Sequence, residues 1–203
     1  MKVAIIGAGN VGKALATSIT RAGHEVTISA SSPESARAAA DESGAASADS
    51  NLAAVDGASV VILAVPFAEA GVLVVNEIRD AVSGRTIIDV TNPIKPDFSG
   101  LATSTSAAEE FQVLLPAAHV IKAFNTVFAS NQANPSSDVD GYVAGDDADA
   151  KEVVLRLVES IGMKPLDVGP LSAARHLEGM AYINIGLNAA NGWSWTSAWH
   201  LER

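Results

Sequence analysis

The chain lacks cysteine altogether, has only 5% aromatic residues, and contains no long apolar run among its 203 residues. Without cysteine, disulfide scaffolds, zinc–thiolate sites, iron–sulfur clusters and cysteine nucleophiles are excluded. The first apolar run, residues 3–6, is shorter than the roughly 7–15 residues of a secretory leader. The run at residues 60–66 is shorter than the roughly 18 residues of a membrane span. We therefore expect no membrane partner and, by default, a soluble cytoplasmic protein.

Positive charge is also scarce. The 13 lysine and arginine residues are outnumbered by 23 aspartate and glutamate residues, which gives a net charge of −10. A basic surface of the kind that binds nucleic-acid phosphates is therefore not expected. Charged residues make up 18% of the chain and apolar residues 48%, a balance that excludes a disordered chain. The length suits one globular domain with at most a small addition.

Short β-branched runs alternate with helical spacing along most of the chain. The pattern predicts strands at residues 1–6, 25–29, 60–65, 86–90, 120–124 and about 165–168. It predicts helices at residues 10–22, 33–41, 67–82, 107–115, 148–161, 171–190 and 193–201, with the longest irregular stretch at residues 125–140. Strands that are each followed by a helix indicate a parallel sheet wound on both faces. We predict an α/β fold, with a doubly wound, mostly parallel sheet over residues 1–170 and a small helical C-terminal part over residues 171–203.

Three glycines, Gly7, Gly9 and Gly12, form a G-x-G-x-x-G sequence between the first predicted strand and the first predicted helix. In the Rossmann dinucleotide-binding fold, the first glycine makes the tight turn, the second lets the backbone approach a pyrophosphate, and the third lets the helix pack closely on the sheet. Amides at the helix N-terminus then face the phosphates. A glycine-rich turn without a ligand is the alternative. A P-loop is excluded, because Ala14 follows Lys13 where that motif needs serine or threonine to hold magnesium.

The residues after the second predicted strand select the dinucleotide. NAD sites place an aspartate or glutamate near this strand end, where it accepts hydrogen bonds from the ribose 2′-hydroxyl. Here the strand ends in Ser29, Ala30, Ser31 and Ser32, without a carboxylate. Hydroxyls and amides at a helix start can donate to a 2′-phosphate, and Arg37, one turn further on, adds positive charge. The pattern favours NADP(H) over NAD; the alternative is that these serines only cap a helix and form a loop.

The ends of the two middle strands supply the rest of the predicted cleft, since doubly wound sheets bind ligands at their carboxyl edge. Ala64, Val65 and Pro66 end one strand, and Asn92 and Pro93 follow the next. We expect Asn92 to contact the nicotinamide ribose or carboxamide, unless it only forms a turn before proline.

Other polar residues give no clear acid–base constellation, so no catalytic residue and no metal site are predicted. Lys122 and Asn125 flank the end of the next strand and could orient substrate or cofactor, or merely cap the strand and open a loop. Arg175 and Glu178 lie three residues apart on a predicted helix and could pair with each other. The four histidines are scattered, without a carboxylate at metal-ligand spacing: His24, His119, His176 and His200.

Several blocks, taken in order over nearly the whole chain, resemble the NADPH-dependent reductases of the deazaflavin coenzyme F420. They include VAIIGAGNVGKALA, VVILAVPF, IIDVTNP, VIKAFNT, DVGPLSAARHLE and a terminal W-x-x-x-W. The resemblance implies a homodimer in which the NADP(H) nicotinamide stacks on the deazaflavin of coenzyme F420. It assigns the pyrophosphate to Gly7, Ala8, Gly9, Asn10, Val11 and Gly12, the 2′-phosphate to Ser31 and Ser32, and the cleft lining to Val65, Pro66, Asn92 and Pro93. Many relatives carry an arginine directly after the second strand, where this chain has Ala30.

Three functions are compatible with this sequence. The leading hypothesis is an oxidoreductase that moves hydride between NADP(H) and the deazaflavin coenzyme F420 by direct transfer between stacked rings, with the protein supplying orientation and a dry site. The same cleft could serve an NADPH-dependent flavin or metal reductase. A non-enzymatic NADP(H)-sensing module is the third hypothesis, with the stretch at residues 125–140 as its switch.

All of the tryptophans lie close to the C-terminus, at Trp193, Trp195 and Trp199. On a helix, Trp195 and Trp199 would share one face. Large rings at a terminus that would otherwise fray are expected to pack against something. They could pack on the preceding helix of the same chain, form a subunit interface together with Ile183 and Leu187, or face the second substrate. We expect a homodimer in which the C-terminal helical parts pack on each other.

Overall fold

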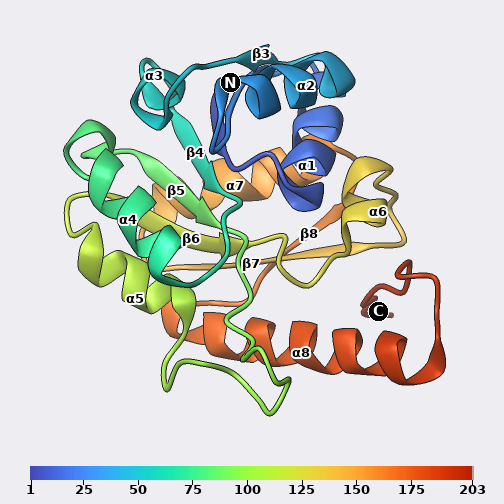
Figure 1. Ribbon diagram of the computed structural model, residues 1–203. Helices are drawn as coiled ribbons and strands as arrows, with labels where there is room; N and C mark the ends of the chain where they lie inside the picture. The colour runs from blue at the N-terminus through green and yellow to red at the C-terminus, as the bar shows by residue number, and fades with distance from the viewer. Residues whose placement is uncertain (203) are drawn as a thin grey trace.

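One central sheet organises the computed structural model, which describes residues 1–202 (Figure 1). Within these residues the strand order is β3-β2-β1-β4-β5-β6-β7-β8. The strands are β1 Lys2–Ile6, β2 Glu25–Ser29, β3 Ala46–Ser47, β4 Val60–Leu63, β5 Thr86–Asp89, β6 His119–Ala123, β7 Asp140–Gly145 and β8 Lys164–Asp167. Neighbouring strands are parallel except β6 and β7, which pair antiparallel. The predicted mostly parallel, doubly wound sheet is confirmed.

Helices cover both faces of this sheet. They are α1 Asn10–Arg21, α2 Pro33–Ser43, α3 Asn51–Val55, α4 Glu69–Ile78, α5 Ala107–Leu114, α6 Ala129–Ala133, α7 Ala148–Ser160 and α8 Ala174–Asn191, with 3-10 turns at Asp80–Val82 and Leu171–Ala173. None of the helices described over residues 1–202 combines the length and the apolar character needed to span a membrane.

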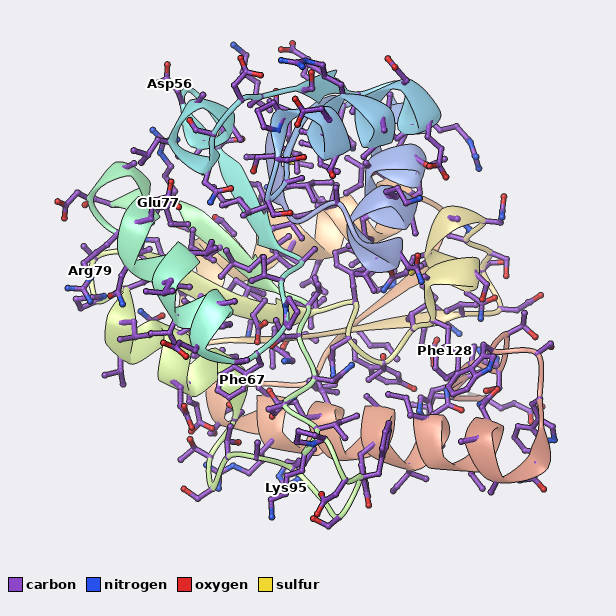
Figure 2. All side chains as sticks on the ribbon, viewed as in Figure 1. Asp56, Phe67, Glu77, Arg79, Lys95 and Phe128 are labelled. Carbon is purple, nitrogen blue, oxygen red and sulfur yellow. The ribbon has the colours of Figure 1, made fainter. Side chains whose placement is uncertain are left out.

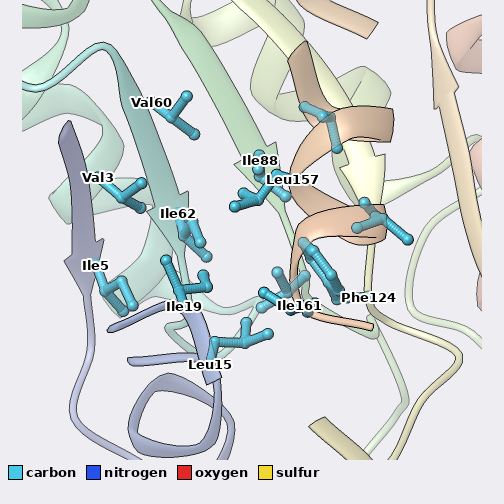
Figure 3. Packing of buried hydrophobic residues seen from close by; sticks show 14 of the residues in the cluster. Val3, Ile5, Leu15, Ile19, Val60, Ile62, Ile88, Phe124, Leu157 and Ile161 are labelled. Carbon is cyan, nitrogen blue, oxygen red and sulfur yellow. The ribbon is translucent and has the colours of Figure 1, made fainter. Parts of the chain in front are cut away.

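Two hydrophobic clusters, one on each face, hold the helices to the sheet. Successive side chains of a strand point to opposite faces, so a strand buried on both sides must be apolar throughout. In β1, Val3 and Ile5 belong to the cluster that contains Leu15 of α1, whereas Ala4 and Ile6 belong to the other cluster. Figure 3 shows the first cluster, in which β1 and β4 face α1. This alternation explains why the strand predictions from β-branched runs were correct.

The structure adds short elements that the sequence pattern did not predict. Strand β3 and helix α3 lie between α2 and β4, and helix α6 lies within the stretch expected to be irregular. Strand β7 is antiparallel to β6, so the connection that contains α6 begins and ends at the same edge of the sheet and does not cross to the other edge. Its antiparallel pairing places the 124–139 connection beside the carboxyl ends of the parallel strands.

The predicted helix at residues 193–201 is wrong. Helix α8 ends at Asn191, and Gly192 has the left-handed φ of 63° that is typical of a helix C-cap. The residues that follow have no helical hydrogen bonds, because side chains from other elements bind their carbonyl groups: Ser130 donates to the Trp195 carbonyl and Asn131 to the Thr196 carbonyl. We call residues 193–201 the C-terminal strap. It folds back toward α6 (Figure 1).

Candidate functional site

The glycine turn has the geometry that the sequence predicts. Gly7 has a φ of 111°, and a Cβ there would lie 2.3 Å from the Ala64 carbonyl oxygen. A Cβ on Gly12 would lie 1.9 Å from the Gly7 carbonyl oxygen, so α1 packs directly on the turn. Gly9 differs, because a Cβ there would meet no atom within 4 Å. The first and third glycines are thus required by the fold, whereas the second faces open space.

Gly9 is also the N-cap residue of α1, and no side chain caps this helix. The first amides of a helix have no partner inside the helix and carry the positive end of its dipole. At α1 these amides lie beside the open space above Gly9, which is the arrangement that binds a phosphate group. The residues present therefore fit a dinucleotide pyrophosphate.

Three adjoining cavities follow the carboxyl edge of the sheet. The first, of about 420 Å³, lies at the ends of β1, β2 and β4, and its lining includes Gly7, Ala8, Gly9, Ser31, Ala64, Val65 and Pro66. The second, of about 310 Å³, is lined by residues that include Gly9, Asn10, Val11, Pro66 and Asn92. The third, of about 380 Å³, shares Asn10, Val11 and Asn92 with the second and continues to α6, α8 and the C-terminal strap. Because neighbouring cavities share residues, they form one groove at the point where the strand order reverses around β1, the place where doubly wound sheets bind ligands.

The predicted 2′-phosphate residues lie at the start of the groove, and the structure places them differently from one another. Ser31 lines the first cavity together with Ser35. The Ser32 hydroxyl caps α2 by accepting from the Ser35 amide at 3.2 Å. Arg37 does not line the cavity and pairs with Asp49 at 3.0 Å. The start of α2, which is rich in hydroxyl groups, therefore faces this part of the groove, whereas Arg37 forms an exposed ion pair.

Ser29 is fully buried rather than facing the groove. Its hydroxyl donates to Asn51 Oδ1 at 2.8 Å, and Asn51 lines the first cavity. Within residues 1–202, no charged side chain lines any of the three cavities. The carboxylate that an NAD site uses is therefore absent from the described lining of the first cavity.

Asn92 and Asn125 are brought together at the ends of β5 and β6. Asn92 Nδ2 donates to the Asn125 carbonyl, and Asn125 Nδ2 donates to Asn92 Oδ1, both at 2.9 Å. Phe124, just before Asn125, has a φ of 64°, an uncommon conformation for a bulky residue that tends to mark functional positions. Pro93 is buried behind this pair and does not line the groove. The two asparagines form a fixed polar junction between the second and third cavities.

Two carbonyl oxygens in the third cavity have no hydrogen-bond partner: Asn125 Oδ1 and Gln132 Oε1. Gln132 Nε2 already donates to the Phe124 and Val127 carbonyls, so Oε1 is the atom left free. Both side chains are more than nine-tenths buried. A buried acceptor without a donor is costly. Both oxygens are covered by neighbouring atoms, so a small shift of either side chain would be needed for a ligand N–H or O–H group to reach it.

A buried ionic cluster lies behind the groove, and the sequence analysis missed it. Lys122 Nζ contacts Asp89 Oδ2 and Glu178 Oε1, each at 2.8 Å, and donates to the Thr91 carbonyl. All three ionisable side chains are fully buried. One lysine cannot neutralise two carboxylates, and burial raises the pKa of Glu178 against the opposing effect of Lys122. Through Lys122, the cluster links Glu178 of α8 to Asp89 and Thr91, which lie just before Asn92.

Lys122 therefore neither caps a strand end nor faces the groove. The expected pairing of Arg175 with Glu178 is wrong, because Arg175 pairs with Glu109 of α5 and Glu178 turns inward to Lys122. The signal that could have pointed to this cluster is the lysine itself, which interrupts an otherwise apolar strand.

The histidines form no metal site within residues 1–202, where no group of three potential metal ligands is found. His119 lies 3.2 Å from Asp147 and His200 lies 3.7 Å from the buried Asp140; both histidine side chains are partly exposed. His24 bonds to the N-terminal amine and to Ser160, and burial lowers its pKa.

Comparison with known proteins gives matches over the whole chain. Residues 2–93 match the model of the family described as NADP oxidoreductase, coenzyme F420-dependent. A solved structure from Arthrobacter sp. FB24, provisionally assigned as an F420-dependent NADP reductase, is 26% identical and has a TM-score of 0.89, with 100% of both chains covered. A hypothetical protein from Sinorhizobium meliloti is 33% identical with a TM-score of 0.72, over 86% of this chain and 87% of that one.

Among curated proteins, the Metalloreductase STEAP3 of Rattus norvegicus is 32% identical over 179 residues, which cover 87% of this chain. The chain spans 36% of the length of that relative.

Proposed function

Because the chain belongs to the family described as NADP oxidoreductase, coenzyme F420-dependent, we propose that it transfers hydride between NADP(H) and a deazaflavin coenzyme of the F420 type. The single observation that carries the proposal is the groove of adjoining cavities. Its first two parts run from the end of β2 past the glycine turn to Asn92. Its third part lies directly beyond, where a second planar ring would meet the nicotinamide.

In this proposal the residues of the chain bind the dinucleotide, orient its nicotinamide ring and exclude water. The nicotinamide dinucleotide supplies the hydride when bound. The amides at the start of α1 hold the pyrophosphate, and the Asn92–Asn125 pair fixes the polar edge of the nicotinamide. A planar ring that fills the third cavity displaces water from the reacting carbon atoms. Direct transfer between two carriers depends on close stacking and orientation more than on a strong acid, so the absence of charged side chains from the described lining is compatible with it.

Steady-state turnover with NADPH and alternative acceptors tests the proposal. We expect the protein to oxidise NADPH when the acceptor is a tail-less deazaflavin, that is, the deazaflavin ring without the charged tail of the coenzyme. The reaction is measured as a change in absorbance. Riboflavin and ferric citrate serve as competing acceptors under the same conditions. Turnover of riboflavin or iron but not of deazaflavin would contradict the proposal.

A flavin or metal reductase is the second candidate function. The observation that favours it is the 32% identity to a metalloreductase over most of this chain. The groove accommodates both functions, since flavin and deazaflavin rings share their planar shape. Binding of NADPH without turnover of any acceptor would instead favour a sensing module.

The cofactor preference is a separate prediction. We expect NADP⁺ to bind at least tenfold more tightly than NAD⁺, a difference of about 1.4 kcal/mol, because hydroxyls rather than a carboxylate line the first cavity. Isothermal titration calorimetry measures both affinities. Ser31→Asp should weaken NADP⁺ binding more than NAD⁺ binding, since a carboxylate there repels the 2′-phosphate. Equal affinities of the wild-type protein for the two dinucleotides would contradict the prediction.

We propose a homodimer that forms through the outer face of α8. Ile183 and Leu187, one turn apart, are 53% and 43% exposed on this helix, and apolar residues of this kind are typical of subunit interfaces. The wild-type protein should sediment as a dimer. Ile183→Glu combined with Leu187→Glu should give a monomer, whereas Val113→Glu, at an exposed position on α5, should leave the dimer intact. A monomeric wild-type protein would rule out this assembly.

A further inference from the structure

The C-terminal strap forms one wall of the third cavity. Ser194 and Trp195 line it together with the asparagine junction at the strand ends. The Trp195 indole meets the Phe128 ring edge-on, with centroids 5.4 Å apart and planes at 83°. Figure 2 shows Phe128 beside the strap, above the C-terminal half of α8. Two aromatic rings from distant parts of the chain thus enclose one side of the cavity.

Side chains from two helices hold the strap in place. From α6, Ser130 Oγ donates to the Trp195 carbonyl at 2.6 Å and Asn131 Nδ2 donates to the Thr196 carbonyl at 2.9 Å. From α8, Asn188 Nδ2 donates to Ser197 Oγ at 2.6 Å. These bonds hold the chain at the tryptophan and at the two residues after it, so its position is set by the two helices that also line the cavity.

Trp195 adopts a backbone conformation that bulky residues rarely take, with a φ of 57°. Such a conformation persists only where surrounding contacts enforce it, and it is found most often at functional sites. The indole remains 45% exposed, although so large an apolar ring gains free energy from burial. Trp193, two residues earlier, is similarly exposed but does not line the cavity. What distinguishes Trp195 is therefore its place at the cavity wall.

We propose that Trp195 is a specificity-determining residue whose indole contacts the ring of the hydride acceptor, and this inference rests on the proposed function. The chemistry of the cavity names the class of ligand: a planar, uncharged heteroaromatic ring with N–H or O–H donors. The donors face the wall to which Asn125 and Gln132 contribute and reach their unpaired oxygens after a small side-chain shift, and the ring face packs on the aromatic wall. The charged tail of a coenzyme would extend outside, since charged side chains are absent from the described lining.

Trp195→Ala, compared with Trp193→Ala, tests this inference. Trp195→Ala should raise the KM for a tail-less deazaflavin about tenfold, as expected for the loss of one stacking contact. Its Kd for NADP⁺ should stay unchanged, because the glycine turn lies at the other end of the groove. Trp193→Ala should change neither constant. Trp195→Phe should have a KM close to that of the wild-type protein. This result would not be expected if Trp195→Ala acted only through a loss of structure.

A second measurement separates this inference from the proposed function. The affinity of the NADP⁺-bound protein for the deazaflavin is measured by quenching of the ring's fluorescence. If the deazaflavin ring binds Trp195→Ala more weakly than wild type, the inference is supported, even when the wild-type protein shows no turnover. Absence of turnover would count only against the proposed function. Equal ring affinity and equal KM for Trp195→Ala and wild type would overturn the inference while leaving the proposed function intact. A wild-type protein that binds no ring would overturn both.

Discussion

Replacing Gly9 with valine is expected to abolish NADP(H) binding and to leave the fold intact. The backbone at Gly9 has φ −73° and ψ −175°, which a β-branched residue adopts readily. A Cβ there would touch no protein atom within 4 Å, so the added methyl groups enter the space above the α1 amides that the pyrophosphate needs. We expect a loss of at least a hundredfold in affinity, roughly 2.7 kcal/mol, in calorimetric titration with NADP⁺.

Gly12→Ala is the matched comparison for this variant. A Cβ at Gly12 would lie 1.9 Å from the Gly7 carbonyl oxygen, so this smaller change must displace α1 and should lower the free energy of unfolding. Gly9→Val should instead unfold at the same temperature as the ligand-free wild-type protein. If Gly9→Val bound NADP⁺ with wild-type affinity, the pyrophosphate would not lie at this turn.

Lys122→Met is expected to destabilise the fold strongly. It leaves Asp89 and Glu178 buried without their cation, and removal of one partner from a buried ion pair costs about 3–5 kcal/mol. Urea denaturation measures the loss in the free energy of unfolding. Lys13→Met provides the control, because the Lys13–Glu42 pair is partly exposed and such pairs contribute about 0–1 kcal/mol. Equal effects of the two substitutions would show that the buried cluster contributes little.

The pH dependence of the Lys122→Met effect follows from Glu178. Burial raises the pKa of this carboxyl above its ordinary value of 4.5. A carboxyl group with a raised folded-state pKa costs nothing while it is protonated in both states. Its cost grows as pH rises from the unfolded-state pKa to the folded-state pKa, and it stays constant above that. Removal of Lys122 raises that pKa further and adds to the cost of ionisation. The destabilisation should therefore be smaller near about pH 5 than near about pH 8; the opposite trend would mean that Glu178 is not the group responsible.

The parts of the fold that the sequence predicts are those whose signal is local. Strands such as β1 and β4 are apolar throughout because helices cover both faces, and short β-branched runs express this directly. The glycine turn was likewise predictable, since its spacing reflects close contacts within a single strand–turn–helix unit. Helix α6 has only five residues in a segment rich in proline, asparagine and serine, so it left no periodic pattern.

Other features depend on contacts between residues far apart in the chain. The spacing of Trp195 and Trp199 suggested a helix, but α6 binds the strap's carbonyl groups from 65 residues away and holds it in a non-helical path. Local spacing also suggested that Glu178 pairs with Arg175, whereas its actual partner lies 56 residues away in β6. The local sequence identifies the partner in neither contact, because each contact arises only when the sheet is assembled.

Direct transfer of hydrogen between the two carriers is the claim at the centre of this account. Its most direct test uses NADPH that carries deuterium at the transferred position of nicotinamide C4, with a tail-less deazaflavin as acceptor in ordinary water. The reduced deazaflavin is then examined by mass spectrometry. Direct transfer predicts one deuterium in the product, bound to carbon, because the rings react face to face without exchange with solvent. A reduced product that contains only solvent hydrogen would contradict direct transfer.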